Sequence, residues 1–141
     1  MKFSNLHYPL PLRTLYLGKE KHLLLSNFMI RWDGGKITAR QGFIWDGASI
    51  PHRLRGIVSK AGDIQWAACI HDWLYLNRVL DDNTIIYRAF ADRILLEGMK
   101  EVPVEVENGD TTVRVPWYRR GIVYSGVRIG GWLVWNRRNF D

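Results

Sequence analysis

His71 and Asp92 are the residues whose types and positions best suit acid–base chemistry. His71 lies in the middle of the apolar face of one predicted helix, and Asp92 lies in the middle of the apolar face of the next. Burying a carboxylate is unfavourable unless a partner satisfies it, and His71 is the natural partner within reach. The carboxylate would hold the imidazole ring in one tautomer while the other ring nitrogen takes a proton from water. Tyr75, one turn after His71, is placed to hydrogen-bond Asp92, so the three residues predict a supported general base.

A cation site is predicted beside this base. Asp72 follows His71 about a quarter turn round the helix. Calcium takes several oxygen ligands, so Asp72 would be helped by backbone carbonyls of the loop 42–49. This loop precedes the helix and contains Asp46 and Gly47, which complete the predicted site.

The same residues allow other assignments. His71 and Asp92 can be a satisfied buried pair that only fixes the register of two helices, or Asp92 can pair with Arg88 one turn earlier. Structural ion pairs are common, and residue types alone slightly favour these structural interpretations. His52, His71 and a carboxylate are a third candidate set, as zinc ligands, but their spacing in the sequence does not specifically indicate a zinc site. A nucleophilic Ser49–His71 pair lacks the Gly-x-Ser-x-Gly turn that usually exposes such a serine.

Two amphipathic helices, 64–75 and 83–99, must position these groups. In each helix the apolar residues recur at three- and four-residue spacing, the period of one helix face. The expected faces are Ile64, Ala67, Ala68, His71, Leu74 and Tyr75 in the first helix and Ile85, Ala89, Asp92, Leu96 and Met99 in the second. The connector 76–82 is short, so the helices should lie antiparallel and pack together. The expected N-caps are Asp63 for the first helix and Asp82 or Asn83 for the second.

The N-terminal part of the chain predicts strands. Residues 1–13 contain two prolines and are expected to form an extended arm. Strands are expected over 14–18, 22–32 and 37–40, with a turn at 33–36 between the last two. A loop over 42–51 and a short helix over 53–60 lead into the helix pair.

The C-terminal part predicts a hairpin and a closing helix. Residues 104–107 and 111–115 alternate on either side of Asn108-Gly109-Asp110, which is a strong hairpin pattern. The segment 117–135 should be a helix that packs on the core through its small residues, which are Gly121, Ser125 and Gly130. A transmembrane span needs about 20 apolar residues, and three arginines interrupt this one. A helix lying in a membrane interface is the alternative.

Length and composition limit the remaining possibilities. The 141 residues suit one domain, and 47% hydrophobic residues with mixed charges indicate a globular protein. We expect an α+β fold, in which a small antiparallel sheet packs with the His–Asp helix pair and the C-terminal helix. The expected parts are 1–41 (arm and strands), 42–100 (loop and helix pair), 101–116 (hairpin) and 117–141 (helix and tail). The net charge of +6 favours an anionic partner. Cys69 is the only cysteine, which excludes a cysteine-based metal site, and no signal peptide is expected at the start.

The middle of the chain resembles the DUF1353 family of tailed phages and prophages. The resemblance lies in Gly42-Phe43-Ile44-Trp45-Asp46-Gly47-Ala48-Ser49-Ile50-Pro51, in Ala67-Ala68-Cys69-Ile70-His71-Asp72-Trp73-Leu74-Tyr75, and in residues 88–99 with Arg88, Ala91-Asp92 and Met99. These motifs occur in the family's order, and the hairpin is an insertion relative to its compact pattern. The resemblance implies a phage origin and production in the host cytoplasm, with incorporation into the virion as an alternative.

A shorter stretch, His71-Asp72-x-x-Tyr75 followed by Asp92, is similar to phospholipase A2. This resemblance implies that His71 is the base, that Asp72 binds calcium, and that Asp92 and Tyr75 support the histidine. The disulfides and the Gly-rich calcium loop of that family are not reproduced. The expected function is a calcium-dependent lipid hydrolase acting on a phospholipid surface. The alternative is a phage tail or assembly protein that binds other phage proteins, and specific nucleic-acid binding is not predicted.

Overall fold

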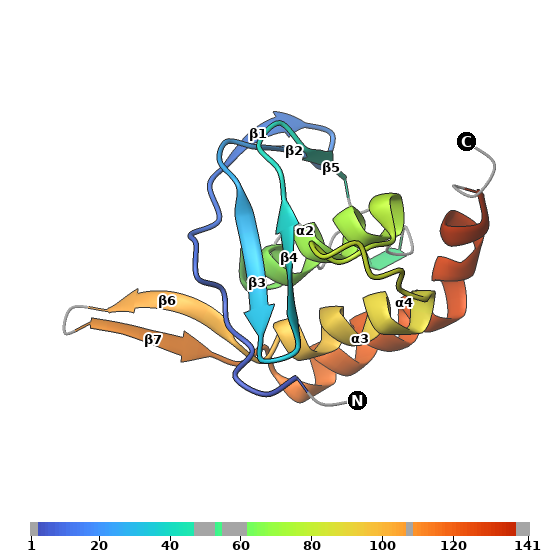
Figure 1. The fold of residues 1–141 in the computed structure, drawn as a ribbon. Helices are drawn as coiled ribbons and strands as arrows, with labels where there is room; N and C mark the ends of the chain where they lie inside the picture. The colour runs from blue at the N-terminus through green and yellow to red at the C-terminus, as the bar shows by residue number, and fades with distance from the viewer. Residues whose placement is uncertain (1–2, 47–52, 55–61, 107–108, 138–141) are drawn as a thin grey trace.

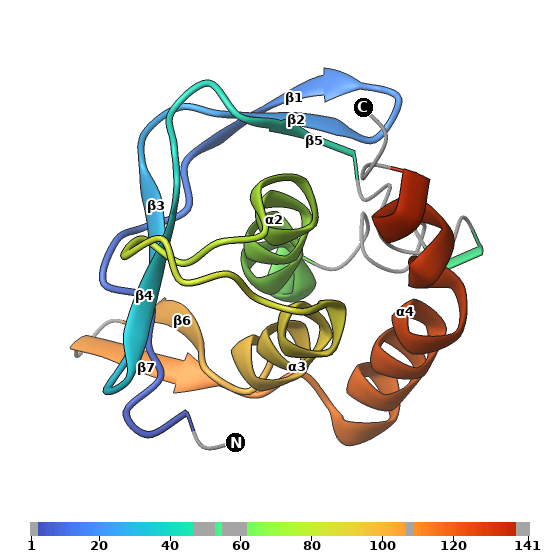
Figure 2. The same ribbon diagram turned by 45° about the vertical axis from the view of Figure 1, so that its right-hand side comes forward.

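The computed structural model describes residues 3–46, 53–54, 62–106 and 109–137. These residues form small antiparallel sheets and three helices, which confirms the predicted α+β class (Figure 1). The helices are α2 (Gly62–Asn77), α3 (Arg88–Gly98) and α4 (Trp117–Arg137). Figure 2 shows α2 near the centre, with strands above it and to its left and with α3 and α4 below it and to its right. The face of α2 that carries His71 and Tyr75 is therefore in the interior of the protein.

Two of the sheets lie in the N-terminal part of the chain. The first has the order β1-β2-β5, and the second pairs β3 with β4. Their bounds are β1 Thr14–Gly18, β2 Lys21–Leu24, β5 Ile44–Trp45, β3 Phe28–Trp32 and β4 Gly35–Ala39. The prediction of one strand over 22–32 is wrong, because the chain leaves the first sheet at Leu24 and enters the second at Phe28. Asn27 holds this corner, since its side-chain oxygen accepts a hydrogen bond from the backbone N–H of Gln41 at 2.8 Å.

Helix α2 confirms the predicted apolar face. All six residues of that face, His71 among them, have no exposed surface. The helix begins at Gly62, so Asp63 lies in its first turn and is not the N-cap that was predicted. Asp63 instead accepts two hydrogen bonds from Arg119 of α4, at 3.0 and 3.1 Å.

Helix α3 begins five residues later than predicted. The preceding residues form a turn in which Leu80 N–H donates to Thr84 at 2.9 Å and Asp82 accepts from Thr84 N–H at 2.9 Å. Asn83 adopts a φ of 69°, which a helical residue cannot have. Asp82 and Asn83 therefore close a turn, and the prediction that either caps the helix is wrong.

The predicted apolar face of this second helix is partly wrong. Ile85 lies outside α3 and is 74% exposed, and Ala89 is also exposed, whereas Asp92 and Met99 are buried as predicted. The buried residues of α3 are Ala91, Asp92, Ile94, Leu95 and Gly98. The late start of the helix explains the exposure of Ile85, which belongs to the connector, whereas Ala89 lies within α3 on its exposed side.

The third sheet is a hairpin, as predicted, and it projects from the body of the protein (Figure 1), but each of its strands begins two residues earlier than predicted. It pairs β6 (Val102–Val106) with β7 (Gly109–Val113).

Helix α4 follows at the predicted place, but the prediction that its small residues face the core is wrong. Gly121 and Ser125 are exposed and Gly130 is half-buried, while Val123 and Val127 are fully buried, because these valines belong to one apolar cluster with residues of α2 and α3. Within the described residues, no helix is long and apolar enough to cross a membrane.

Candidate active site

Four side chains donate hydrogen bonds to the carboxylate of Asp92, which has no exposed surface. Its Oδ1 atom accepts from His71 Nε2 at 2.8 Å and from the Tyr75 hydroxyl at 2.6 Å. Its Oδ2 atom accepts from Arg88 Nη1 at 3.2 Å and from Arg128 Nη1 at 2.8 Å. We call these five residues the Asp92 cage. The predicted pairing of Asp92 with His71 and Tyr75 is confirmed, and so is the alternative pairing with Arg88. Both occur together because His71 and Tyr75 bind Oδ1, whereas Arg88 binds Oδ2.

The cage joins all three helices. His71 and Tyr75 are four residues apart on α2 and so lie on one face of it, and Arg88 and Asp92 have the same relation on α3. Arg128 comes from α4. Arg88 also donates to two backbone carbonyls of α4, at Val127 (3.0 Å) and Arg128 (3.3 Å). The carboxylate and this arginine therefore hold α4 against the other two helices.

The cage fixes the protonation of its members. Burial alone would raise the pKa of Asp92, but the hydrogen bond and charge of His71, with the hydrogen bonds of Tyr75 and Arg128, outweigh it and lower the pKa. An ionised carboxylate only accepts hydrogen bonds, so His71 Nε2 must carry a proton, and Nδ1 holds a lone pair whenever the ring is neutral. Burial and the neighbouring Asp92 raise the pKa of Tyr75, so its hydroxyl stays protonated and donates.

A glycine lets α4 approach the cage closely. A Cβ atom at Gly131 would lie 2.6 Å from the Tyr75 hydroxyl oxygen and 3.4 Å from Arg88 Nη1. Any side chain at this position would therefore displace Tyr75 or push α4 away. At the end of α4 the guanidinium of Arg78 lies over the ring of Trp135, 3.9 Å from its centroid, and donates to the backbone carbonyl of the same tryptophan.

The predicted cation site is not assembled from the described residues. Asp72 is buried, with 2% of its surface exposed, and Asp46 is half-buried. Gly47 lies outside the described residues, as do Ser49 and His52. Among the side chains that the structure describes, no three His, Cys, Asp or Glu residues gather as metal ligands. Calcium binding by Asp72 therefore stays a prediction, and we derive no chemical step from it.

The cysteine beside the site is not suited to nucleophilic chemistry. Cys69 is fully buried on α2. Burial raises the pKa of its thiol well above the usual value, and the nearby charge of Asp72 raises it further. Because the thiolate is the reactive form, this side chain acts as part of the apolar core.

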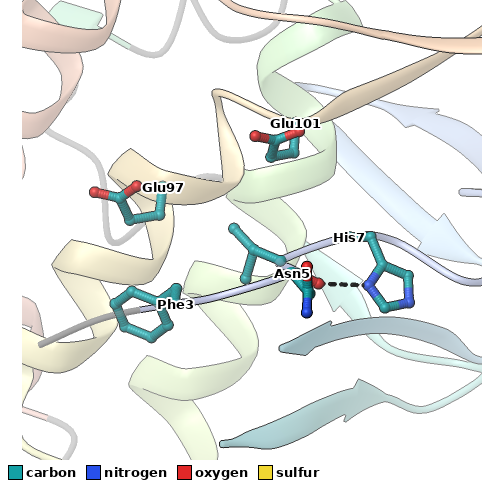
Figure 3. A pocket seen from close by; sticks show the side chains of 6 residues that line it. Phe3, Asn5, His7, Glu97 and Glu101 are labelled. Atoms are coloured by element: carbon teal, nitrogen blue, oxygen red, sulfur yellow. Dashed lines mark hydrogen bonds between the residues drawn. The ribbon is translucent and has the colours of Figure 1, made fainter. Parts of the chain in front are cut away.

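A separate hollow of about 500 Å³ lies between the N-terminal arm and the end of α3 (Figure 3). Its lining includes Glu97, Glu101 and His7. The His7 ring is turned away from both glutamates in Figure 3, and its Nδ1 atom is 2.7 Å from the backbone oxygen of Asn5. Glu97 already pairs with Arg93 and Lys100. The described residues that line this hollow therefore present no cluster of unpaired carboxylates for a cation.

The sequence prediction missed Arg128 and Gly131. One pattern could have identified Arg128, because a lone charge stands between Val127 and Ile129 in a largely apolar helix. Such a charge needs a buried partner or an exposed position. The partner, Asp92, is 36 residues away on another helix. Nothing local to Gly131 indicated that Tyr75 would lie against it.

Residues 23–127 match a protein-family model described as "Protein of unknown function (DUF1353)". The matched segment contains His71, Tyr75, Arg88 and Asp92 and ends one residue before Arg128. No curated protein and no solved structure is significantly similar to the chain.

Proposed function

The chain belongs to the DUF1353 family, whose function is unknown, and we propose that it is a phage-encoded hydrolase with His71 as its general base. The observation that supports this proposal is the 2.8 Å contact between His71 Nε2 and Asp92 Oδ1, an oxygen that also accepts from Tyr75. A catalytic histidine needs this kind of partner, because the carboxylate fixes the tautomer and stabilises the imidazolium. The arrangement agrees with the roles that the resemblance to phospholipase A2 implies.

The proposed reaction is the hydrolysis of a phospholipid ester. The Nδ1 atom of His71 takes a proton from water, and the hydroxide attacks the ester carbonyl carbon. When the tetrahedral intermediate collapses, the bond to the alcohol oxygen breaks, and the leaving alkoxide takes the proton back from Nδ1. Asp92 remains ionised throughout and stabilises the transient imidazolium.

Burial limits the rate of this reaction. His71 has no exposed surface, so water and an ester reach Nδ1 only through a local opening of the fold. The two guanidinium groups on Oδ2 also offset the negative charge that would stabilise the imidazolium. We therefore expect slow hydrolysis.

The test is release of fatty acid from vesicles of anionic phospholipid, measured with millimolar calcium and again with a chelator. The wild-type protein should release fatty acid, and His71→Gln should release none, because an amide cannot take the proton. The glutamine side chain can still donate to Asp92, so circular dichroism should show an unchanged fold. If the folded wild-type protein releases no fatty acid under either condition, the phospholipid hydrolase proposal is wrong.

A second function is favoured by the saturation of Asp92. A carboxylate with four donors, two of them arginines, is what a purely structural link between three helices requires. In this alternative the chain is a non-enzymatic phage component of the tail or of virion assembly, made in the host cytoplasm, and it binds other phage proteins. Mass spectrometry of purified virions separates the two functions, because a structural component should be present in stoichiometric amounts.

A further inference from the structure

We infer that the outward face of α4 binds the surface of an anionic phospholipid bilayer. This inference stands independently of hydrolysis, although a lipid hydrolase would use the same surface to reach its substrate. The face consists of residues spaced three or four apart along one side of the helix. We call it the α4 outer face, and its members are Tyr118, Ile122, Ser125, Ile129, Trp132 and Leu133.

Every member of the α4 outer face is exposed, although all but Ser125 are large apolar or aromatic residues. Ile129 is 77% exposed, and Trp117, beside the face at the start of the helix, is 76% exposed. The opposite side of α4 contacts α3 and is buried through Val123, Val127 and Gly131. The helix is therefore apolar on both sides, and the residues that the structure describes cover only one of them. A continuous exposed apolar patch of this kind usually marks an interaction surface.

The charges of α4 favour an anionic partner. The helix contains four arginines and no aspartate or glutamate, and the whole chain has a net charge of +6. Arg119 and Arg128 are paired with Asp63 and Asp92, while Arg120 donates to the neutral backbone carbonyl of Val115. A second copy of the chain would bring the same net charge of +6 to the contact, and like net charges repel. An anionic bilayer surface would attract this charge instead.

The aromatic residues favour a bilayer over a protein groove. Trp117 and Tyr118 lie at one end of α4, and Trp132 lies near the other. Tryptophan and tyrosine prefer the headgroup level of a bilayer, where the ring is in contact with apolar chains and the polar atom with water. A helix lying in the interface plane would bury Ile122 and Ile129 between these two ends. No helix in the described part of the chain can span a bilayer, so the contact would be at the surface.

The test is flotation of the full-length protein with vesicles of phosphatidylcholine alone and with vesicles that also contain phosphatidylglycerol. A chelator is present throughout, so that calcium cannot contribute. The wild-type protein should float with the anionic vesicles more than with the neutral ones, and added salt should weaken binding. Ile129→Ser should lower the partition coefficient by about tenfold or more, because one buried isoleucine is lost from the contact.

The matched control is Ile85→Ser. Ile85 is 74% exposed and lies on the connector between α2 and α3, so its loss should leave partitioning unchanged. His71→Gln should also bind like the wild type, so a failure of the hydrolase proposal leaves this inference standing. Absence of wild-type binding to anionic vesicles would overturn the inference, and so would an equal loss in Ile129→Ser and Ile85→Ser. Analytical ultracentrifugation showing a dimer that Ile129→Ser dissociates would assign the face to a second copy and would also overturn it.

Discussion

Arg128 Nη1 lies 2.8 Å from Asp92 Oδ2, although 36 residues separate the two in the sequence. This contact is the only side-chain bond from α4 to the carboxylate among the described residues. The Arg128 side chain is 35% exposed, while the Asp92 side chain is fully buried, so the arginine brings a charge from the surface to a buried anion. The position of α4 and the ionisation of Asp92 therefore depend on each other.

Replacing Arg128 with Met should lower the free energy of unfolding by about 1.5–3 kcal/mol, the usual contribution of a hydrogen bond to a charged group. Methionine keeps the apolar length of the side chain and removes the donor. Urea denaturation measures the change. The matched control is Arg93→Met, whose exposed pair with Glu97 should contribute less than about 0.5 kcal/mol. Equal losses in the two variants would mean that the Arg128 contact does not stabilise the fold.

Replacing Asp92 with Ala should cost about 3 kcal/mol or more, because His71 and Arg88 would lose their partner inside the protein. Asp92→Asn should cost less, since the amide oxygen still accepts one or two of the four hydrogen bonds. Chemical denaturation of both variants measures the difference. Unchanged midpoints would contradict the description of Asp92 as a buried anion.

The lowered pKa of Asp92 predicts how stability depends on pH. A carboxyl whose pKa is lower in the folded than in the unfolded protein stabilises the fold above its unfolded pKa, about 3.9. This stabilisation is lost as the pH falls through the folded pKa. Denaturation midpoints measured from neutral pH downwards should therefore fall less steeply in Asp92→Asn than in the wild type. The pKa of Asp82 is also lowered, by its hydrogen bonds with Thr84, so Asp82→Asn shows how much of the wild-type slope comes from that residue.

Gly131→Ala should destabilise the protein, because the new Cβ would lie 2.6 Å from the Tyr75 hydroxyl oxygen. Alanine alone favours a helix by about 1 kcal/mol over glycine, so steric conflict must exceed this gain. Gly121→Ala on the same helix is the matched control, since a Cβ there meets nothing within 4 Å. Thermal unfolding should place the first variant below the wild type and the second at or above it. The opposite order would show that α4 is not closely packed on Tyr75.

Asp72→Asn should remove calcium binding before it affects the fold, if Asp72 is the calcium ligand that the sequence predicts. Isothermal titration calorimetry of the wild type and of this variant at millimolar calcium measures the difference. Asp82→Asn serves as a control, because Asp82 is an exposed carboxylate in a turn. If the wild-type protein shows no heat of binding, the prediction that Asp72 binds calcium is wrong.

The sequence by itself identified four of the five residues of the Asp92 cage. His71, Tyr75 and the Arg88–Asp92 pair follow from helix periodicity, because residues four apart must share a face. The short connector made the two helices neighbours, so a buried carboxylate on one had to find its partner on the other. The hairpin at Gly109 was equally local, since turn residues between alternating segments specify it.

Only the tertiary structure decided the rest. The start of α3 depends on a backbone turn around Asn83, and its exposed Ile85 could not be distinguished from a core residue by spacing alone. The choice of the valine side of α4 over its glycine and serine side depends on which surface α2 and α3 leave to be covered. Arg128 and Gly131 obtained their roles from that choice, because contacts between residues far apart in the sequence exist only once the helices have packed.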